Sequence, residues 1–310
     1  MLVEKMEPPQ IKTVGVALTL IPHSHAVLAE ASRFAQRLNA SLTLIHVGTS
    51  EAESRALLQE TADRFAIPHE KTIFWNQKDP AQALLSAAEQ SGVELLVAGA
   101  FEGPALKRRR FLGPVARRLA ENATCSLLLL AHPRIDQNDF RRIVAITDFS
   151  EYSKRACSQA LWLAQRDSAE SLHIVSIHTV FMEVRAEVRA NDGRPARTRA
   201  EEEELMEKFV LSLPPSDVSV EWRVIEATTG FAACDFAEAM EADLLVLPGH
   251  RPGARMPTIT DWALQVVPCG LWIVHSSPAR NLHEAFLHER DSSFEFSELS
   301  AQTERRRSGK

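Results

Sequence analysis

The chain has 310 residues, which is enough for two domains of ordinary size. Hydrophobic residues make up 45% and charged residues 25%, the balance of a folded protein rather than a disordered one. A formal net charge of −6 argues against nucleic acid as a partner. Because Met1–Gln10 lacks the pattern of a signal peptide and no apolar run has the length of a membrane span, we expect a cytoplasmic protein without a membrane partner.

The first half of the chain alternates strand-like apolar runs with segments of helical period. This alternation is typical of a parallel sheet covered by helices. Strands are predicted at residues 13–19, 42–47, 71–75, 94–99 and 126–131. Helices are predicted at residues 24–38, 51–65, 80–91 and 113–122. Such a sheet places its ligand cleft at the carboxyl ends of its strands.

The second half repeats the same order of elements from Arg142 onward. Phe34-Ala35-Gln36-Arg37 recurs as Leu163-Ala164-Gln165-Arg166, and the strand at residues 95–99 recurs at 245–249 with a larger offset. The larger offset indicates residues inserted in the middle of the second repeat. The sequence therefore predicts an α/β protein with two tandem doubly wound sheets of five parallel strands each.

The repeat also sets the expected domain boundaries. Residues 1–136 form the first predicted domain and residues 137–278 the second. In the second repeat, Ser150 is predicted to start the first helix, and an acidic helix is predicted to begin near Arg199. The periodic pattern ends after this domain, so residues 279–310 are predicted to be a disordered tail.

The loop after the fourth strand of the first repeat has the composition of a phosphate-binding loop. Gly99 and Gly103 precede a spacing of nine residues and then Gly113-Pro114-Val115, at the start of a predicted helix. Glycines allow backbone amides to approach phosphate oxygens, and a helix presents its positive end there. The competing interpretation is a simple turn.

A cationic run lies inside this loop. Lys107, Arg108, Arg109 and Arg110 follow one another directly and can attract a polyphosphate. The alternative is a solvated loop whose charges only maintain solubility.

The second repeat carries weaker candidates for the same kind of site. Gly249 and Gly253 stand where the first repeat has its leading glycines, and Asp148 ends the first strand. The loop is shorter, however, and Pro257-Thr258 replaces the glycine that should begin the helix. We therefore expect an anionic ligand in the first repeat rather than in the second.

The order and spacing of these motifs over residues 11–278 resemble the universal stress protein family, in its tandem two-domain form. Members with bound ATP show G-x2-G-x9-G-[S/T] in this loop and an aspartate after the first strand. Here the first gap is one residue longer, Pro114 replaces the hydroxyl residue and Thr19 replaces the aspartate. The resemblance implies domains of the adenine nucleotide alpha hydrolase-like fold.

The resemblance also implies how the repeats associate and what they do. The last strands, Ser126–Ala131 and Leu271–Ser276, are expected to pair, and the full chain is expected to form a homodimer. The implied function is a non-enzymatic stress-response protein that senses or binds a small ligand such as ATP or another phosphorylated molecule and acts through protein association. Two alternatives are an interaction scaffold that has lost ligand binding and a slow ATP hydrolase.

The sequence does not indicate a catalytic or metal centre. Its histidines lack the spacing of a metal site, and no nucleophile motif or P-loop is present. Cys125 and Cys269 occupy the same position in the two repeats, which favours a packing role over a reactive thiol. His46 and His275 are predicted to be core or rim residues.

Overall fold

A computed structural model gives the arrangement of most of the chain. It describes residues 6–19, 24–48, 52, 56, 58–60, 63, 71–75, 79–101, 111–136, 139–179, 198–250 and 256–275.

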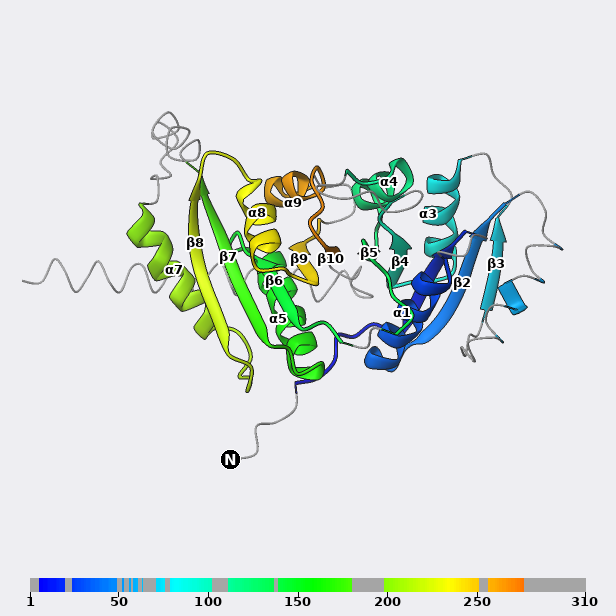
Figure 1. Ribbon diagram of the computed structural model, residues 1–310, viewed down its shortest axis with the longest axis horizontal. Helices are drawn as coiled ribbons and strands as arrows, with labels where there is room; N and C mark the ends of the chain where they lie inside the picture. Colours follow the sequence, from blue (N-terminus) through cyan, green and yellow to red (C-terminus); the bar gives the residue numbers. More distant parts are fainter. Residues whose placement is uncertain are drawn as a thin grey trace, which may run out of the picture. The chain divides into compact units, whose positions relative to one another are not determined.

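The described elements follow the same order in both halves, except that α7 lies between β7 and β8 and no helix with defined bounds is described between β2 and β3 (Figure 1). The first repeat contains β1 (Thr13–Leu18), α1 (Ser24–Leu38), β2 (Ser41–Val47), β3 (Lys71–Trp75), α3 (Pro80–Gln90), β4 (Leu95–Gly99), α4 (Pro114–Asn122) and β5 (Ser126–Leu130). The second contains β6 (Arg142–Ile146), α5 (Glu151–Arg166), β7 (Ser171–Thr179), α7 (Arg199–Leu211), β8 (Val220–Ala227), α8 (Ala232–Ala239), β9 (Leu244–Pro248), α9 (Thr258–Ala263) and β10 (Gly270–Val274).

The strands form one ten-stranded sheet in the order β3-β2-β1-β4-β5-β10-β9-β6-β7-β8. Within each repeat every pair of neighbouring strands is parallel, and the order is that of a doubly wound sheet. The predicted fold class is therefore confirmed.

The two repeats meet at their last strands, which pair antiparallel. Leu271 lies opposite Leu129, Trp272 opposite Leu128, and Ile273 opposite Leu127. Every residue of both strands is buried, so an apolar edge that would be open in each repeat alone is covered inside the chain. The predicted pairing of the last strands is confirmed.

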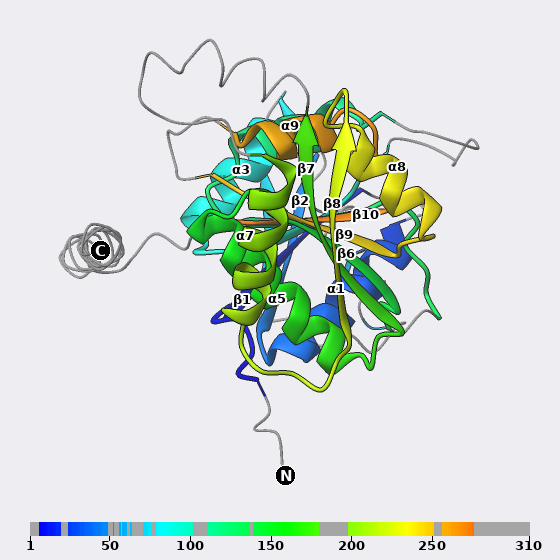
Figure 2. The same cartoon turned by 90° about the vertical axis from the view of Figure 1, so that its left-hand side faces the viewer.

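Helices cover both faces of the sheet. One buried cluster contains side chains of α1, α5 and α7, among them Phe34, Trp162 and Met206. The other contains side chains of α3, α4, α8 and α9, among them Leu119 and Cys234. Figure 2 shows α7 against β7 and β8, which are the last two strands on one side of the sheet. Among the described helices, none is both long and apolar enough to cross a membrane.

Local sequence explains where several helices begin. The Ser150 side chain accepts a hydrogen bond from the Ser153 amide, as predicted for the start of α5. Thr198 and Glu201 form a reciprocal capping box that starts α7 at the predicted position. The helix predicted over residues 51–65 and the tail 279–310 lie largely or wholly outside the described residues. The domain boundary at residue 136 stays a prediction.

The first helix of the first repeat also holds the connection between the repeats. The Arg33 guanidinium donates hydrogen bonds to the carbonyl oxygens of Arg134 (2.7 Å) and Ile135 (2.6 Å). Phe34 packs edge-on against Trp272 with a centroid distance of 5.3 Å. The connection and the last strand of the second repeat are thus both fixed against α1.

Because the β5 and β10 edges are apolar, separately expressed halves should not stay monomeric. We expect residues 1–136 and residues 137–278 each to self-associate, with a mass at least about twofold above that of the single half. Light scattering on each purified half measures this. Two well-behaved monomeric halves would show that the exposed edge is not a liability.

Candidate functional site

The carboxyl ends of β4 and β5 meet the start of α4 in the first repeat. Strand β4 ends at Gly99, and the Ala100 amide donates to the Leu130 carbonyl oxygen (2.9 Å). After the loop, the Gly113 amide donates to the Ala100 carbonyl oxygen (3.0 Å). These two bonds bring the ends of the loop together at the strand-end edge, where the sequence predicted an anion site.

Helix α4 begins at this edge without a side-chain cap. Gly113 is the N-cap residue and makes no side-chain cap bond, and Pro114 occupies the first helical position. The amide donors of the first turn, beginning at Val115, therefore lie at the positive end of the helix dipole. Gly113 itself has φ −59° and ψ 152°, a conformation open to any residue.

Gly99 is not required by packing. A Cβ atom at Gly99 would lie 3.9 Å from Val27 Cγ2 and 4.0 Å from the Phe101 carbonyl oxygen, which are ordinary contacts. Any special role of this glycine must therefore come from what approaches the loop. Gly103 and the cations Lys107, Arg108, Arg109 and Arg110 lie outside the described residues.

Hydroxyl pairs connect the end of the first strand to the first helix in both repeats. Thr19 Oγ1 and Ser24 Oγ lie 2.7 Å apart, and Thr147 Oγ1 and Ser153 Oγ lie 3.0 Å apart. Ser24 and Ser153 align in the repeat, but that match alone does not indicate that each serine contacts a threonine hydroxyl. In the first repeat the hydroxyl pair stands where the family has its adenosine-side aspartate.

His46 completes this edge in the first repeat. Its Nδ1 donates to the Leu18 carbonyl oxygen at 2.8 Å, and the side chain is buried. The bond connects the ends of β1 and β2, in agreement with the predicted structural role.

In the second repeat, Asp148 lies at the expected place after β6, but its side chain forms a hydrogen bond within the turn that follows. Its Oδ1 accepts a hydrogen bond from the Ser150 amide (3.0 Å). Phe149 between them has φ +64° and packs edge-on against Phe209 of α7 at 5.8 Å. Asp148 is exposed, so its carboxylate still faces solvent at the strand-end edge.

Packing explains Gly249 without a ligand. A Cβ atom there would lie 2.8 Å from the His275 ring and 2.8 Å from the Val274 carbonyl oxygen. The His275 Nδ1 donates to the His250 carbonyl oxygen at 3.0 Å, and the two imidazole rings pack edge-on at 4.9 Å. Sequence analysis did not find this histidine pair, because nothing in the spacing of the two residues indicates their contact.

The helix that follows in the second repeat is short. Helix α9 has six residues and begins after Pro257, again without a side-chain cap. The Thr260 hydroxyl donates to the Pro248 carbonyl oxygen at 2.6 Å and is therefore used internally. Gly253 lies outside the described residues. The described part of the second repeat thus offers less to an anion than α4 does.

Cys157, Cys234 and Cys269 are buried free thiols, and Cys125 is a half-buried one. Burial raises the pKa of Cys125 to about 11, and burial also raises the pKa values of Cys157 and Cys269. Each remains a neutral thiol at neutral pH, which agrees with the predicted packing role. Within the described part of the chain, no three His, Cys, Asp or Glu side chains are grouped to hold a metal ion.

The fold and the strand-end edge define a duplicated, doubly wound α/β protein, and comparison with known proteins gives its family. The sequence profile described as "Universal stress protein family" matches residues 48–131 and 139–275. The chain belongs to the universal stress protein family. A search of curated proteins found no match.

Solved structures agree with this assignment. A functionally unknown protein from Pseudomonas aeruginosa PAO1 is 16% identical, with a TM-score of 0.64 over 86% of this chain and 94% of that one. A universal stress protein from Archaeoglobus fulgidus DSM 4304 is 14% identical, with a TM-score of 0.57 over 86% of this chain and 99% of that one. At these identities the likeness shows a shared tandem fold.

Proposed function

We propose that this chain is a non-enzymatic cytoplasmic stress-response protein that binds a small phosphorylated ligand, such as ATP, in its first repeat. Ligand binding would alter its association with other proteins. The observation that carries the proposal is the uncapped N-terminus of α4 at the end of β4. Amide donors at a helix N-terminus suit an anion, and the cationic loop precedes them in the sequence.

Binding without catalysis is favoured by the polar side chains at this edge. Thr19 and Ser24 bond to each other, and His46 bonds to the Leu18 carbonyl oxygen. A general base needs a free acceptor within reach of the group that it activates. The side chains described here instead maintain the shape of the strand-end edge.

Calorimetry with ATP tests the site through Gly113. Gly113→Val should lower the ATP affinity at least about tenfold, because a branched Cβ would hinder the approach of phosphate to the α4 amides. The φ and ψ angles of Gly113 are open to valine, and circular dichroism checks that the variant folds. Gly253→Val in the second repeat is the matched control and should not change binding. Binding lost with Gly253→Val but kept with Gly113→Val would place the ligand in the second repeat.

The cationic run supplies an independent arm of the same experiment. Arg108→Ala combined with Arg109→Ala should weaken ATP binding several-fold at low ionic strength and less at high salt, since screening acts on exposed charges. ATP turnover above background would contradict the non-enzymatic part of the proposal.

An interaction scaffold without a ligand is the second candidate function. It is favoured by the Gly113 amide, which already donates to Ala100, and by Pro114, which has no amide hydrogen. Native mass spectrometry separates the candidates, because a scaffold should be purified without a small molecule and should show no heat of ATP binding.

A further inference from the structure

Strand β8 leaves one edge of the sheet open. It is the terminal strand, and among the described residues no strand pairs with its outer side. Glu221, Trp222 and Arg223 are exposed in its first half, with 38% of the Trp222 surface accessible. An edge strand presents unpaired backbone donors and acceptors that can pair with another chain.

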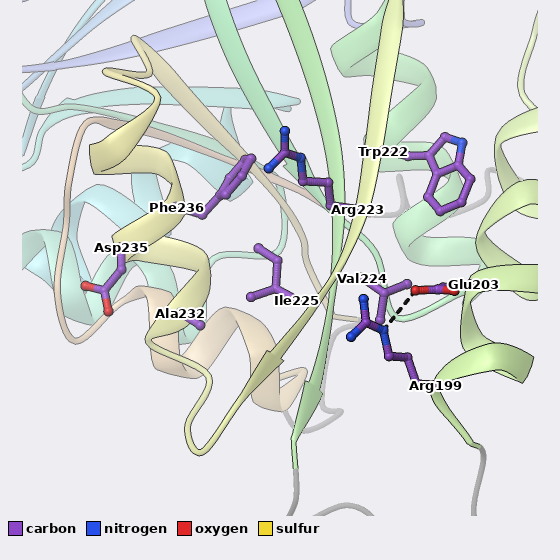
Figure 3. A pocket seen from close by; sticks show the side chains of 9 residues that line it. All are labelled: Arg199, Glu203, Trp222, Arg223, Val224, Ile225, Ala232, Asp235 and Phe236. Carbon is purple, nitrogen blue, oxygen red and sulfur yellow. Dashed lines mark hydrogen bonds and ion pairs between the residues drawn. The ribbon is translucent and has the colours of Figure 1, made fainter.

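A surface hollow of about 630 Å³ follows this edge (Figure 3). Figure 3 shows Trp222 on the side of α7, and Arg223 on the opposite side of the strand, toward Phe236 of α8. The Arg223 guanidinium lies 5.9 Å from the centre of the Phe236 ring. On the same face, a Glu221 carboxylate oxygen lies 3.6 Å from His173 Nδ1. Glu221 and Arg223 thus share one face of β8, and the exposed Trp222 indole lies on the other, together with Glu226.

Symmetry restricts how β8 can pair with a second copy. Two copies related by a two-fold axis perpendicular to the sheet pair antiparallel, and the α7 faces of both sheets then lie on the same side. Each residue is therefore opposite a residue of its own face. In the register where Trp222 lies opposite Trp222 of the second copy, Glu221 lies opposite Arg223 of that copy, and Val220 lies opposite its Val224.

The neighbouring registers are unfavourable. If the two-fold axis moves by one residue along the strand, it passes through Glu221 or through Arg223. Glu221 then lies opposite Glu221 of the second copy, or Arg223 lies opposite Arg223 of the second copy. Like charges directly opposite each other destabilise a strand pair, whereas opposite charges and apolar pairs stabilise it. The segment Val-Glu-Trp-Arg-Val (Val220–Val224) is thus complementary to itself in one register, and like charges make the two neighbouring registers unfavourable.

We propose that β8 is a self-association edge, through which two copies of the chain join their sheets with Trp222 at the two-fold axis. The indole and the valines supply apolar contact on the α7 face. The two Glu221–Arg223 pairs set the register on the α8 face. This dimer does not depend on a bound nucleotide.

Analytical ultracentrifugation of the full chain tests the proposal by charge reversal. The mass of the wild-type chain should rise with concentration from 34.5 kDa toward twice that value. Arg223→Glu and Glu221→Arg should each raise the dissociation constant at least about tenfold, because each opposes like charges across the axis. The double variant Glu221→Arg/Arg223→Glu restores two opposite pairs and should recover dimerisation. Circular dichroism of each single variant checks that it folds.

Arg117→Glu is the control, because it makes the same charge change on the exposed surface of α4. It should leave the dissociation constant unchanged. A monomeric full chain at all concentrations would overturn the proposal. So would a dimer that tolerates Arg223→Glu, which would point to another surface, or a double variant that dimerises no better than the single variants.

Discussion

Arg37→Met should lower the free energy of unfolding by about 3–5 kcal/mol, the cost of breaking a buried ion pair. Arg37 Nε donates to Asp167 Oδ1 at 2.7 Å, and the two side chains are 8% and 3% exposed. Asp167 Oδ2 accepts the Phe140 amide at 3.0 Å. Without Arg37, the carboxylate would remain buried with a single amide donor. Urea unfolding of the full chain measures the loss.

The effect should depend on burial rather than on charge alone. Arg117→Met breaks the ion pair between Arg117 and Glu121, whose side chains are 50% and 44% exposed, respectively. This change should alter the free energy of unfolding by less than about 0.5 kcal/mol. Arg37→Met/Asp167→Asn should be more stable than Arg37→Met, because no unpaired charge is then buried. Equal losses of stability for Arg37→Met and Arg117→Met would mean that the buried Arg37–Asp167 ion pair stabilises the protein no more than an exposed ion pair does.

Local patterns were sufficient to predict the elements of this fold. Alternating apolar residues and helical periods placed the strands and the described helices of the first repeat to within about a residue at each end. Ser150 and the acidic run near Arg199 gave helix starts, because caps are interactions between residues close in sequence. The internal repeat then predicted two similar sheets, and the family resemblance, together with the apolar last strands, predicted the junction between the repeats.

Contacts between distant residues could not be predicted in this way. Arg37 aligns with Arg166 in the repeat, and it forms an ion pair with Asp167, the residue that follows Arg166 in the chain. That contact depends on how α1 meets the connection before β6, which neither repeat encodes alone. Gly249 shows the same limit: its spacing indicated a ligand, but the neighbouring His275 ring already leaves no room for a side chain.

The candidate site was predicted only in part, for a related reason. Spacing placed Gly99, Gly113 and the start of α4 together, and the structure brings them together at the end of β4. Spacing does not say which amides are free, however. The Gly113 amide donates within the protein, and the available donors start later, around Val115.

The buried His275 should make the protein less stable as the pH falls below about 6.5. Burial lowers the pKa of His275 from 6.5 to about 4. The unfolded chain therefore binds a proton at this residue in a pH range where the folded chain does not, so a falling pH lowers the free energy of the unfolded state relative to the folded state. Between pH 6.5 and about 4 the loss from this group should reach about 3 kcal/mol, and it should level off at lower pH.

His275→Asn removes the titrating ring but keeps an N–H donor near the position of Nδ1, which donates to the His250 carbonyl oxygen in the wild type. Urea unfolding of both proteins at a series of pH values gives the difference in their stability. That difference should favour the wild type most above pH 6.5 and should shrink toward pH 4, because only the wild type carries this penalty. His132→Asn, which changes an exposed histidine, should leave the pH dependence as it is in the wild type. A wild-type advantage that stays constant from pH 7.5 to about 4 would mean that His275 is protonated equally well in the folded and unfolded chains, and that its burial beside His250 does not suppress its charge.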